Sequence, residues 1–173
     1  MQNLLSALSV ALADIFVYLM CRQYTSENAS LLLTSVFTFG STIASTMGTA
    51  LWSINGATLF ILLSMLTMLS MHERSAPSMV PPYFLGLFLF SAYLCRPTAA
   101  IFVMLVFAYL LQKKRTLFWK VILTWLILFG GFILFSLREY RQLLPDYYLP
   151  GQLGSSQEFW TALYGNLFIP EGC

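Results

Sequence analysis

The sequence predicts an all-α fold, a polytopic bundle of transmembrane helices. Of its residues 58% are hydrophobic and only 9% are charged, with a mean hydropathy of +0.75, whereas about a quarter of a soluble domain is charged. Apolar runs long enough for a bilayer recur along the chain between short polar breaks. These runs lack the alternation of barrel strands, so the backbone must close its hydrogen bonds within helices.

We expect about five to six membrane spans, each supported by its own sequence features. The first covers residues 4–20, and the second, residues 29–47, is rich in Ser, Thr and Gly, which let helices pack closely. The third covers residues 56–71 and follows Trp52, which suits the interfacial aromatic belt. The last covers residues 117–137 and follows a basic loop.

Residues 83–111 form an apolar stretch with one charged residue, Arg96, directly before Pro97. An intramembrane arginine is costly and is therefore a candidate functional residue. The stretch is either one long tilted helix kinked at Pro97 or two half-helices in a broken-helix hairpin at Arg96-Pro97. The hairpin is favoured, since it places Arg22, Arg74 and residues 113–115 together on the cytoplasmic side. A proline also pushes the preceding residue out of the helical region.

Residues 1–137 are thus expected to be a transmembrane region, and residues 138–173 an extracytoplasmic loop segment of the same, incomplete membrane domain. Arg138 and Arg141 follow the last span and either hold a lipid phosphate by bidentate hydrogen bonds or simply anchor the helix end. Asp14 is a second charge within an apolar run, and we expect it as a buried partner of Arg96, in a structural or a functional pair.

Several other classes of function have little support. The net charge of +2 is too small to indicate a nucleic-acid partner. Cys21, Cys95 and Cys173 are scattered and the chain has a single histidine, so neither a zinc site nor a disulfide framework is predicted. No cofactor is evident. A divalent metal in the complete enzyme stays open, with no ligands for it identified in this chain.

Three segments together resemble the GT-C superfamily of integral membrane glycosyltransferases, near the protein O-mannosyltransferases that use polyprenyl-phosphate sugars. They are TALWSINGATLFILLSMLTML, GLFLFSAYLCRPTAAIFVMLVFAYLLQKKR, with its Arg-Pro-Thr step before an apolar helix and a basic loop, and the terminal LYGNLFIPEGC. The first departs from the family at residues 53–55, and the last at Ile169 and Glu171.

The resemblance implies transfer of a sugar from a polyprenyl-phosphate donor to an extracytoplasmic acceptor. The acidic residues of such enzymes lie mainly on a large first extracytoplasmic loop, which has no counterpart here, so we expect an internal or truncated fragment that is inactive alone. Arg96, and then Arg138 and Arg141, are the candidates for binding the donor phosphate. The expected partners are the lipid bilayer, the lipid-linked sugar, and missing helices of the same enzyme or a partner subunit.

Two alternatives stay open. The first alternative is a transporter or channel subunit that binds an anionic solute at Arg96. The second is a non-catalytic membrane partner protein. In each case we expect a multi-pass protein of the bacterial inner (plasma) membrane.

Overall fold

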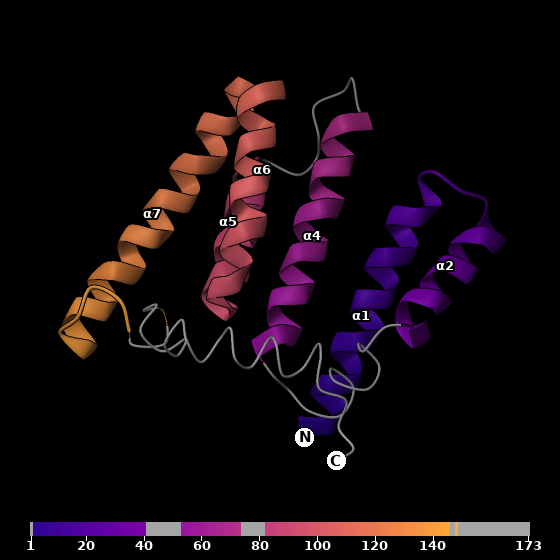
Figure 1. The fold of residues 1–173 in the computed structure, drawn as a ribbon, viewed down its shortest axis with the longest axis horizontal. Helices are drawn as coiled ribbons and strands as arrows, with labels where there is room; N and C mark the ends of the chain where they lie inside the picture. The colour runs from indigo at the N-terminus through magenta and orange to yellow at the C-terminus, as the bar shows by residue number, and fades with distance from the viewer. Residues whose placement is uncertain (1, 41–52, 74–81, 146–147, 149–173) are drawn as a thin grey trace, which may run out of the picture. The chain divides into compact units, whose positions relative to one another are not determined.

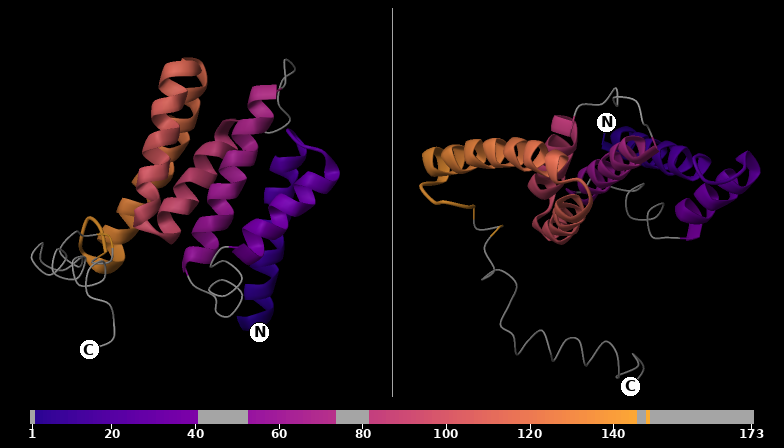
Figure 2. Two further views of the ribbon diagram at one scale, coloured as in Figure 1. Left: turned by 45° about the vertical axis from the view of Figure 1, so that its right-hand side comes forward. Right: turned by 90° about the horizontal axis from the view of Figure 1, so that it is seen from above.

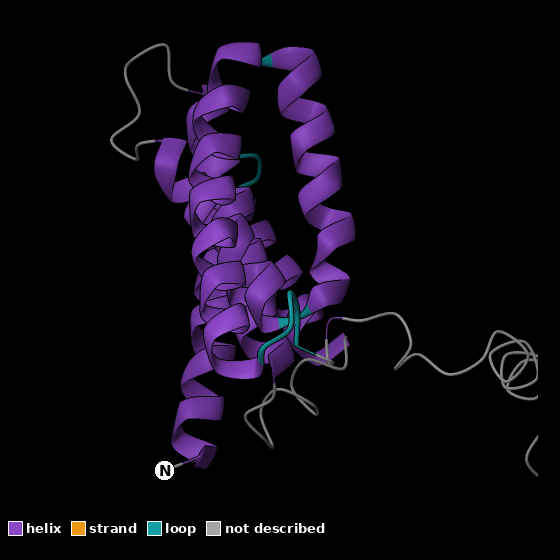
Figure 3. Cartoon of the chain, turned by 90° about the vertical axis from the view of Figure 1, so that its left-hand side faces the viewer, coloured by secondary structure: helices purple, strands orange, loops and turns teal. Residues whose placement is uncertain are grey.

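The computed structural model describes residues 2–40, 53–73, 82–145 and 148. These residues form helices and short connections, with no strand among them (Figures 1 and 3). The chain divides into two compact units, residues 1–129 and 130–173. The division falls inside the last helix, and the expected end of the transmembrane region at residue 137 stays a prediction.

Helix α1 (Gln2–Arg22) contains the first predicted span and is long and apolar enough to cross a membrane. Helix α2 (Glu27–Gly40) begins where the second span was expected. The rest of that span, residues 41–47, lies outside the described residues.

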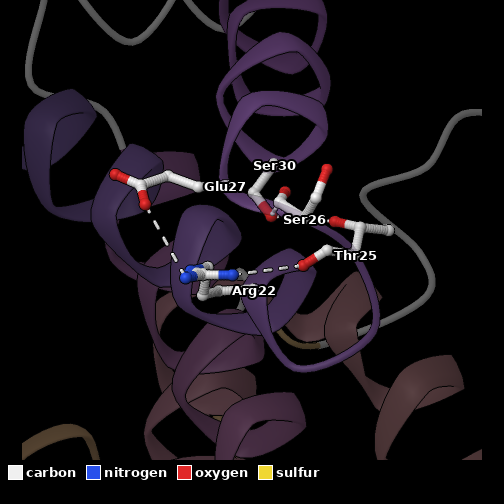
Figure 4. Close-up of polar contacts among 5 residues, drawn as sticks. All are labelled: Arg22, Thr25, Ser26, Glu27 and Ser30. Atoms are coloured by element: carbon white, nitrogen blue, oxygen red, sulfur yellow. Dashed lines mark hydrogen bonds and ion pairs between the residues drawn. The ribbon is translucent and has the colours of Figure 1, made fainter.

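The turn between α1 and α2 is held by short polar contacts (Figure 4). The hydroxyls of Thr25 and Ser30 lie 2.8 Å apart, and the Ser30 hydroxyl donates to the carbonyl oxygen of Ser26 at 2.9 Å. Arg22 reaches the Glu27 carboxylate at 3.7 Å, an exposed ion pair that contributes little stability. The hydroxyl contacts therefore tie the residues of the turn to the first turn of α2.

The remaining helices follow in the order that the sequence predicts. They are α4 (Ser53–Glu73), α5 (Pro82–Cys95), the short 3₁₀ helix η1 (Pro97–Ala99), α6 (Ala100–Lys113) and α7 (Arg115–Tyr140). Both α4 and α7 are long and apolar enough to cross a membrane. In contrast, α5 and α6 have 14 residues each, a rise of about 21 Å that falls short of a hydrocarbon core of about 30 Å.

The favoured broken-helix hairpin is confirmed. Gly56, near the start of α4, lies against Cys95 at the end of α5, so these two helices are antiparallel. The amino group of Lys114, just after α6, donates to the carbonyl oxygen of Met71 near the end of α4 at 2.7 Å. Since α6 therefore runs parallel to α4, α5 and α6 must run in opposite directions, and the single kinked helix is excluded.

The hairpin also brings basic residues to one end of the first unit. Figures 1 and 2 show the α1–α2 turn and the end of α4 at the same end as the junction of α6 and α7. Arg22 thus shares that end with residues 113–115, as the cation bias predicts. Arg74 lies outside the described residues. Which membrane face this end occupies stays a prediction.

Two apolar clusters hold the first unit together. One joins α1 to α4 through Ala13, Val17 and Leu62. The other joins the hairpin to the first half of α7, and its buried members are Leu85, Leu89, Val103, Val106, Leu110, Phe118 and Val121.

Gly86 sets how closely α5 approaches α7 within the second cluster. A Cβ atom at this position would lie 2.7 Å from the backbone oxygen of Val121 and 2.9 Å from the Cβ of Thr124. A backbone atom cannot rotate away, so a larger residue must push the two helices apart.

We predict that Gly86→Ala lowers the free energy of unfolding by about 1–3 kcal/mol, the usual cost of overpacking. Thermal unfolding of the purified protein in detergent would measure the loss. Gly130→Ala is the matched control, because its Cβ would meet nothing within 4 Å and alanine favours the helix. An unfolding temperature for Gly86→Ala equal to or above that of the control would contradict the close approach.

Candidate functional site

The break in the hairpin places Arg96 between two helices, and both backbone polar groups of Arg96 are hydrogen-bonded. Its φ of −151° and ψ of 118° are extended, as expected for a residue before a proline. Its N–H donates to the carbonyl oxygen of Ala92 at 3.0 Å, and its own carbonyl oxygen accepts from the N–H of Ala99 at 3.0 Å. The position of Arg96 is therefore fixed by hydrogen bonds on both sides of the break.

The side chain of Arg96 is half-buried and lines a cavity of about 520 Å³. It makes no ion pair or side-chain hydrogen bond with any residue that the structure describes. The walls come from the start of α4, from η1 and from the start of α6. Besides Arg96 they are Ile54, Ala57, Thr58, Ile61, Thr98, Ala99, Ile101, Phe102 and Leu105. The cavity thus combines one cation and two hydroxyls with apolar walls.

Gly56 brings α4 close to the break. A Cβ atom on this residue would lie 2.8 Å from the Sγ of Cys95, the residue directly before Arg96. The absence of a side chain lets the end of α5 seat against α4, beside the part of α4 that lines the cavity. Gly56 therefore helps to set the position of Arg96.

Asp14 does not pair with Arg96 in this structure. Its Oδ1 accepts a hydrogen bond from the Thr38 hydroxyl of α2 at 2.7 Å, and it makes no ion pair with Arg96. The reason is the order of the helices, because α4 lies between α1 and the hairpin (Figure 1). The carboxylate instead ties α1 to α2, so no acidic group from α1 neutralises the guanidinium.

Arg138 and Arg141 belong to the second unit and are exposed. The Nε of Arg138 lies 3.9 Å from a carboxylate oxygen of Glu139, and their side chains are 86% and 54% exposed. Arg141 follows the last residue of α7 with a φ of 55°, the left-handed conformation that ends many helices. The Ser136 hydroxyl donates to the carbonyl oxygen of Gln142 at 2.9 Å, so the chain folds back over the helix end.

Two hydroxyls of the cavity were not singled out from the sequence. Thr98 belongs to the Arg-Pro-Thr step that carried the resemblance, so its position next to the break was visible there. Thr58 gave no such signal, since only the packing of α4 against the hairpin brings it to Arg96. The part of the chain that the structure describes contains no cluster of three metal-ligating side chains.

Comparison with protein families gives a match over residues 2–138 to the model of the dolichyl-phosphate-mannose-protein mannosyltransferases. The chain belongs to this family. The whole Arg96 cavity lies within the matched residues, whereas Arg141 lies just beyond them. This mannosyltransferase-family chain is accordingly an integral membrane protein related to glycosyltransferases that use a lipid-linked sugar. Comparisons with curated proteins and with solved structures gave no match.

We predict that Arg141→Gly raises the free energy of unfolding of this mannosyltransferase-family protein by about 1 kcal/mol, because a left-handed conformation is costly for any residue with a Cβ. The change should appear as a higher unfolding temperature in detergent. Gln142→Gly is the control, since Gln142 has no positive φ to relieve and glycine adds freedom only to the unfolded chain. A gain in both variants, or in neither, would argue against the helix-end geometry.

Proposed function

We propose that this chain forms the donor-binding side of a membrane glycosyltransferase that moves a sugar from a polyprenyl-phosphate carrier to an extracytoplasmic acceptor. One observation carries the proposal. Arg96 presents a cation, without a partner among the described residues, to a cavity whose other walls are mainly apolar.

Such a cavity suits an amphiphilic anion. A guanidinium binds phosphate through paired N–H donors, and Coulomb attraction strengthens where water is scarce. The walls formed by Ile61, Phe102 and Leu105 can bury hydrocarbon of the carrier chain, which contributes about 0.8 kcal/mol per buried methylene. The family match, which covers the cavity, agrees with a lipid-linked sugar donor.

The proposed chemistry requires negative charge to be stabilised. The bond between the anomeric carbon and the phosphate oxygen breaks, the acceptor oxygen bonds to the same carbon with inversion, and the acceptor proton goes to a base. The leaving phosphate then gains charge, which a preorganised cation stabilises. None of the residues that line the cavity is acidic, so the base must come from outside this wall.

The cavity favours this function over transport of a small anion. A hydrated solute needs several polar groups to replace its water, whereas here seven of the ten lining residues are alanine, isoleucine, phenylalanine or leucine. Arg138 and Arg141 are proposed in a lesser role, as phosphate contacts or anchors at the extracytoplasmic membrane surface. The proposed location is the inner membrane of a bacterium.

We predict that Arg96→Ala weakens binding of dolichyl phosphate by about tenfold to a hundredfold, as expected for loss of hydrogen bonds to a charged group. Photo-crosslinking of a photoreactive dolichyl phosphate to the chain in lipid nanodiscs would measure it. Arg96→Lys should retain part of the affinity, since it keeps the charge but loses the planar donor pair.

Arg22→Ala is the control, because Arg22 is an exposed arginine paired with Glu27 and lies outside the cavity. Unchanged binding in Arg96→Ala would refute the proposed donor site. Displacement of the lipid by inorganic phosphate at comparable concentration would favour the transporter instead.

A further inference from the structure

We propose that the hydroxyls of Thr58 and Thr98 act with Arg96 as a three-point cradle for the phosphate of an amphiphilic ligand. The inference rests on the proposed function and extends it, because it assigns binding groups that charge alone does not reveal. Thr58 comes from α4 and Thr98 from η1, so the cradle would combine groups from two of the elements that line the cavity.

The hydroxyls of serine and threonine in this chain commonly bond within their own helix. In apolar surroundings such a hydroxyl donates to the carbonyl oxygen four residues earlier, which satisfies it without a partner helix. The described residues that do so within helices are Ser9, Thr34, Ser35, Thr38, Ser64, Thr67, Ser70 and Thr124.

Thr58 departs from this pattern. It lies in α4 with the carbonyl of Ile54 four residues earlier, yet its hydroxyl makes no hydrogen bond with any residue that the structure describes. Its side chain is half-buried, and it lines the cavity together with Arg96. A hydroxyl left unbonded in apolar surroundings costs free energy, and a ligand oxygen in the cavity would remove that cost.

Thr98 also has an unbonded hydroxyl, although its side chain is exposed whereas that of Thr58 is half-buried. It lies in η1 directly after Pro97, where the helical ladder is interrupted. Its hydroxyl likewise has no hydrogen-bond partner in the described part of the chain, and it borders the cavity two residues from Arg96. The break that exposes the guanidinium therefore also frees a hydroxyl beside it.

The three groups match a tetrahedral anion better than a planar one. A phosphate carries several acceptor oxygens that point in different directions, so it can accept from a guanidinium and from two hydroxyls on different helices. A carboxylate has only two oxygens, which lie in one plane, and a bidentate contact with Arg96 engages both of them. The hydroxyls would thus select a lipid phosphate over a fatty carboxylate.

The test is binding to the chain in lipid nanodiscs of Thr58→Val and Thr98→Val, which keep the side-chain shape and remove the hydroxyl. Each should weaken photo-crosslinking of dolichyl phosphate by about tenfold, as expected for one hydrogen bond to a charged oxygen. The affinity for a long-chain fatty acid should stay within about twofold. Thr58→Ser and Thr98→Ser, which keep the hydroxyl, should bind dolichyl phosphate nearly as the parent chain does.

Thr34→Val is the matched control, because it also loses a hydroxyl from a half-buried threonine, one bonded to Ser30 and outside the cavity. Thermal unfolding of each variant identifies any that fail to fold, and the serine variants then carry the test. Inorganic phosphate as competitor separates a headgroup site on a lipid from a site for free phosphate.

The outcomes distinguish the two proposals. Full binding by both valine variants, together with loss in Arg96→Ala, would overturn the cradle and leave the donor site standing. Full binding by all three variants would overturn both. Equal losses for dolichyl phosphate and for the fatty acid would show that the hydroxyls do not select phosphate, which also contradicts the cradle.

Discussion

The interruption of the helix at Arg96-Pro97 is the constraint on which the rest of the described structure depends. Because a residue before proline avoids the helical region, Arg96 becomes extended and α5 and α6 fold into a hairpin. A backbone opened within a membrane must find other hydrogen bonds, and Ala92 and Ala99 supply them. The same break leaves a charged side chain beside the start of α4, so local chain geometry and the candidate site have one origin.

Close helix packing then gives the break its surroundings. In lipid, helices associate through van der Waals contact and small residues rather than by hiding apolar surface from water. Gly56 seats the end of α5 on α4, and Gly86 seats its middle on α7. The hydrogen bond from Lys114 to Met71 joins α4 to the hairpin at the opposite end. The Arg96 cavity lies between helices that are fixed at both ends.

The charges of the first unit have separate uses. Asp14 bonds to Thr38 and joins α1 to α2, and Arg22 and Glu27 meet at the exposed turn. Arg96 alone lines the cavity as a cation. A guanidinium without a partner in low dielectric is energetically costly, which makes Arg96 a candidate for binding a ligand of opposite charge. The family match over residues 2–138 is the reason that we propose a lipid-linked sugar as this ligand.

The sequence by itself determined the helical class, the membrane setting and the break at Arg96, because hydropathy, positive charges at helix ends and proline sterics act over short stretches of chain. The Arg-Pro-Thr step also led to the family. Only the tertiary structure decided which side chains meet. Asp14 accepts a hydrogen bond from Thr38, and Thr58 lines the same cavity as Arg96 although the two residues belong to helices that are distant in sequence. The physical reason is that a side chain on an apolar helix carries no local sign of its neighbour, which depends on helix order and on the glycines that permit close approach.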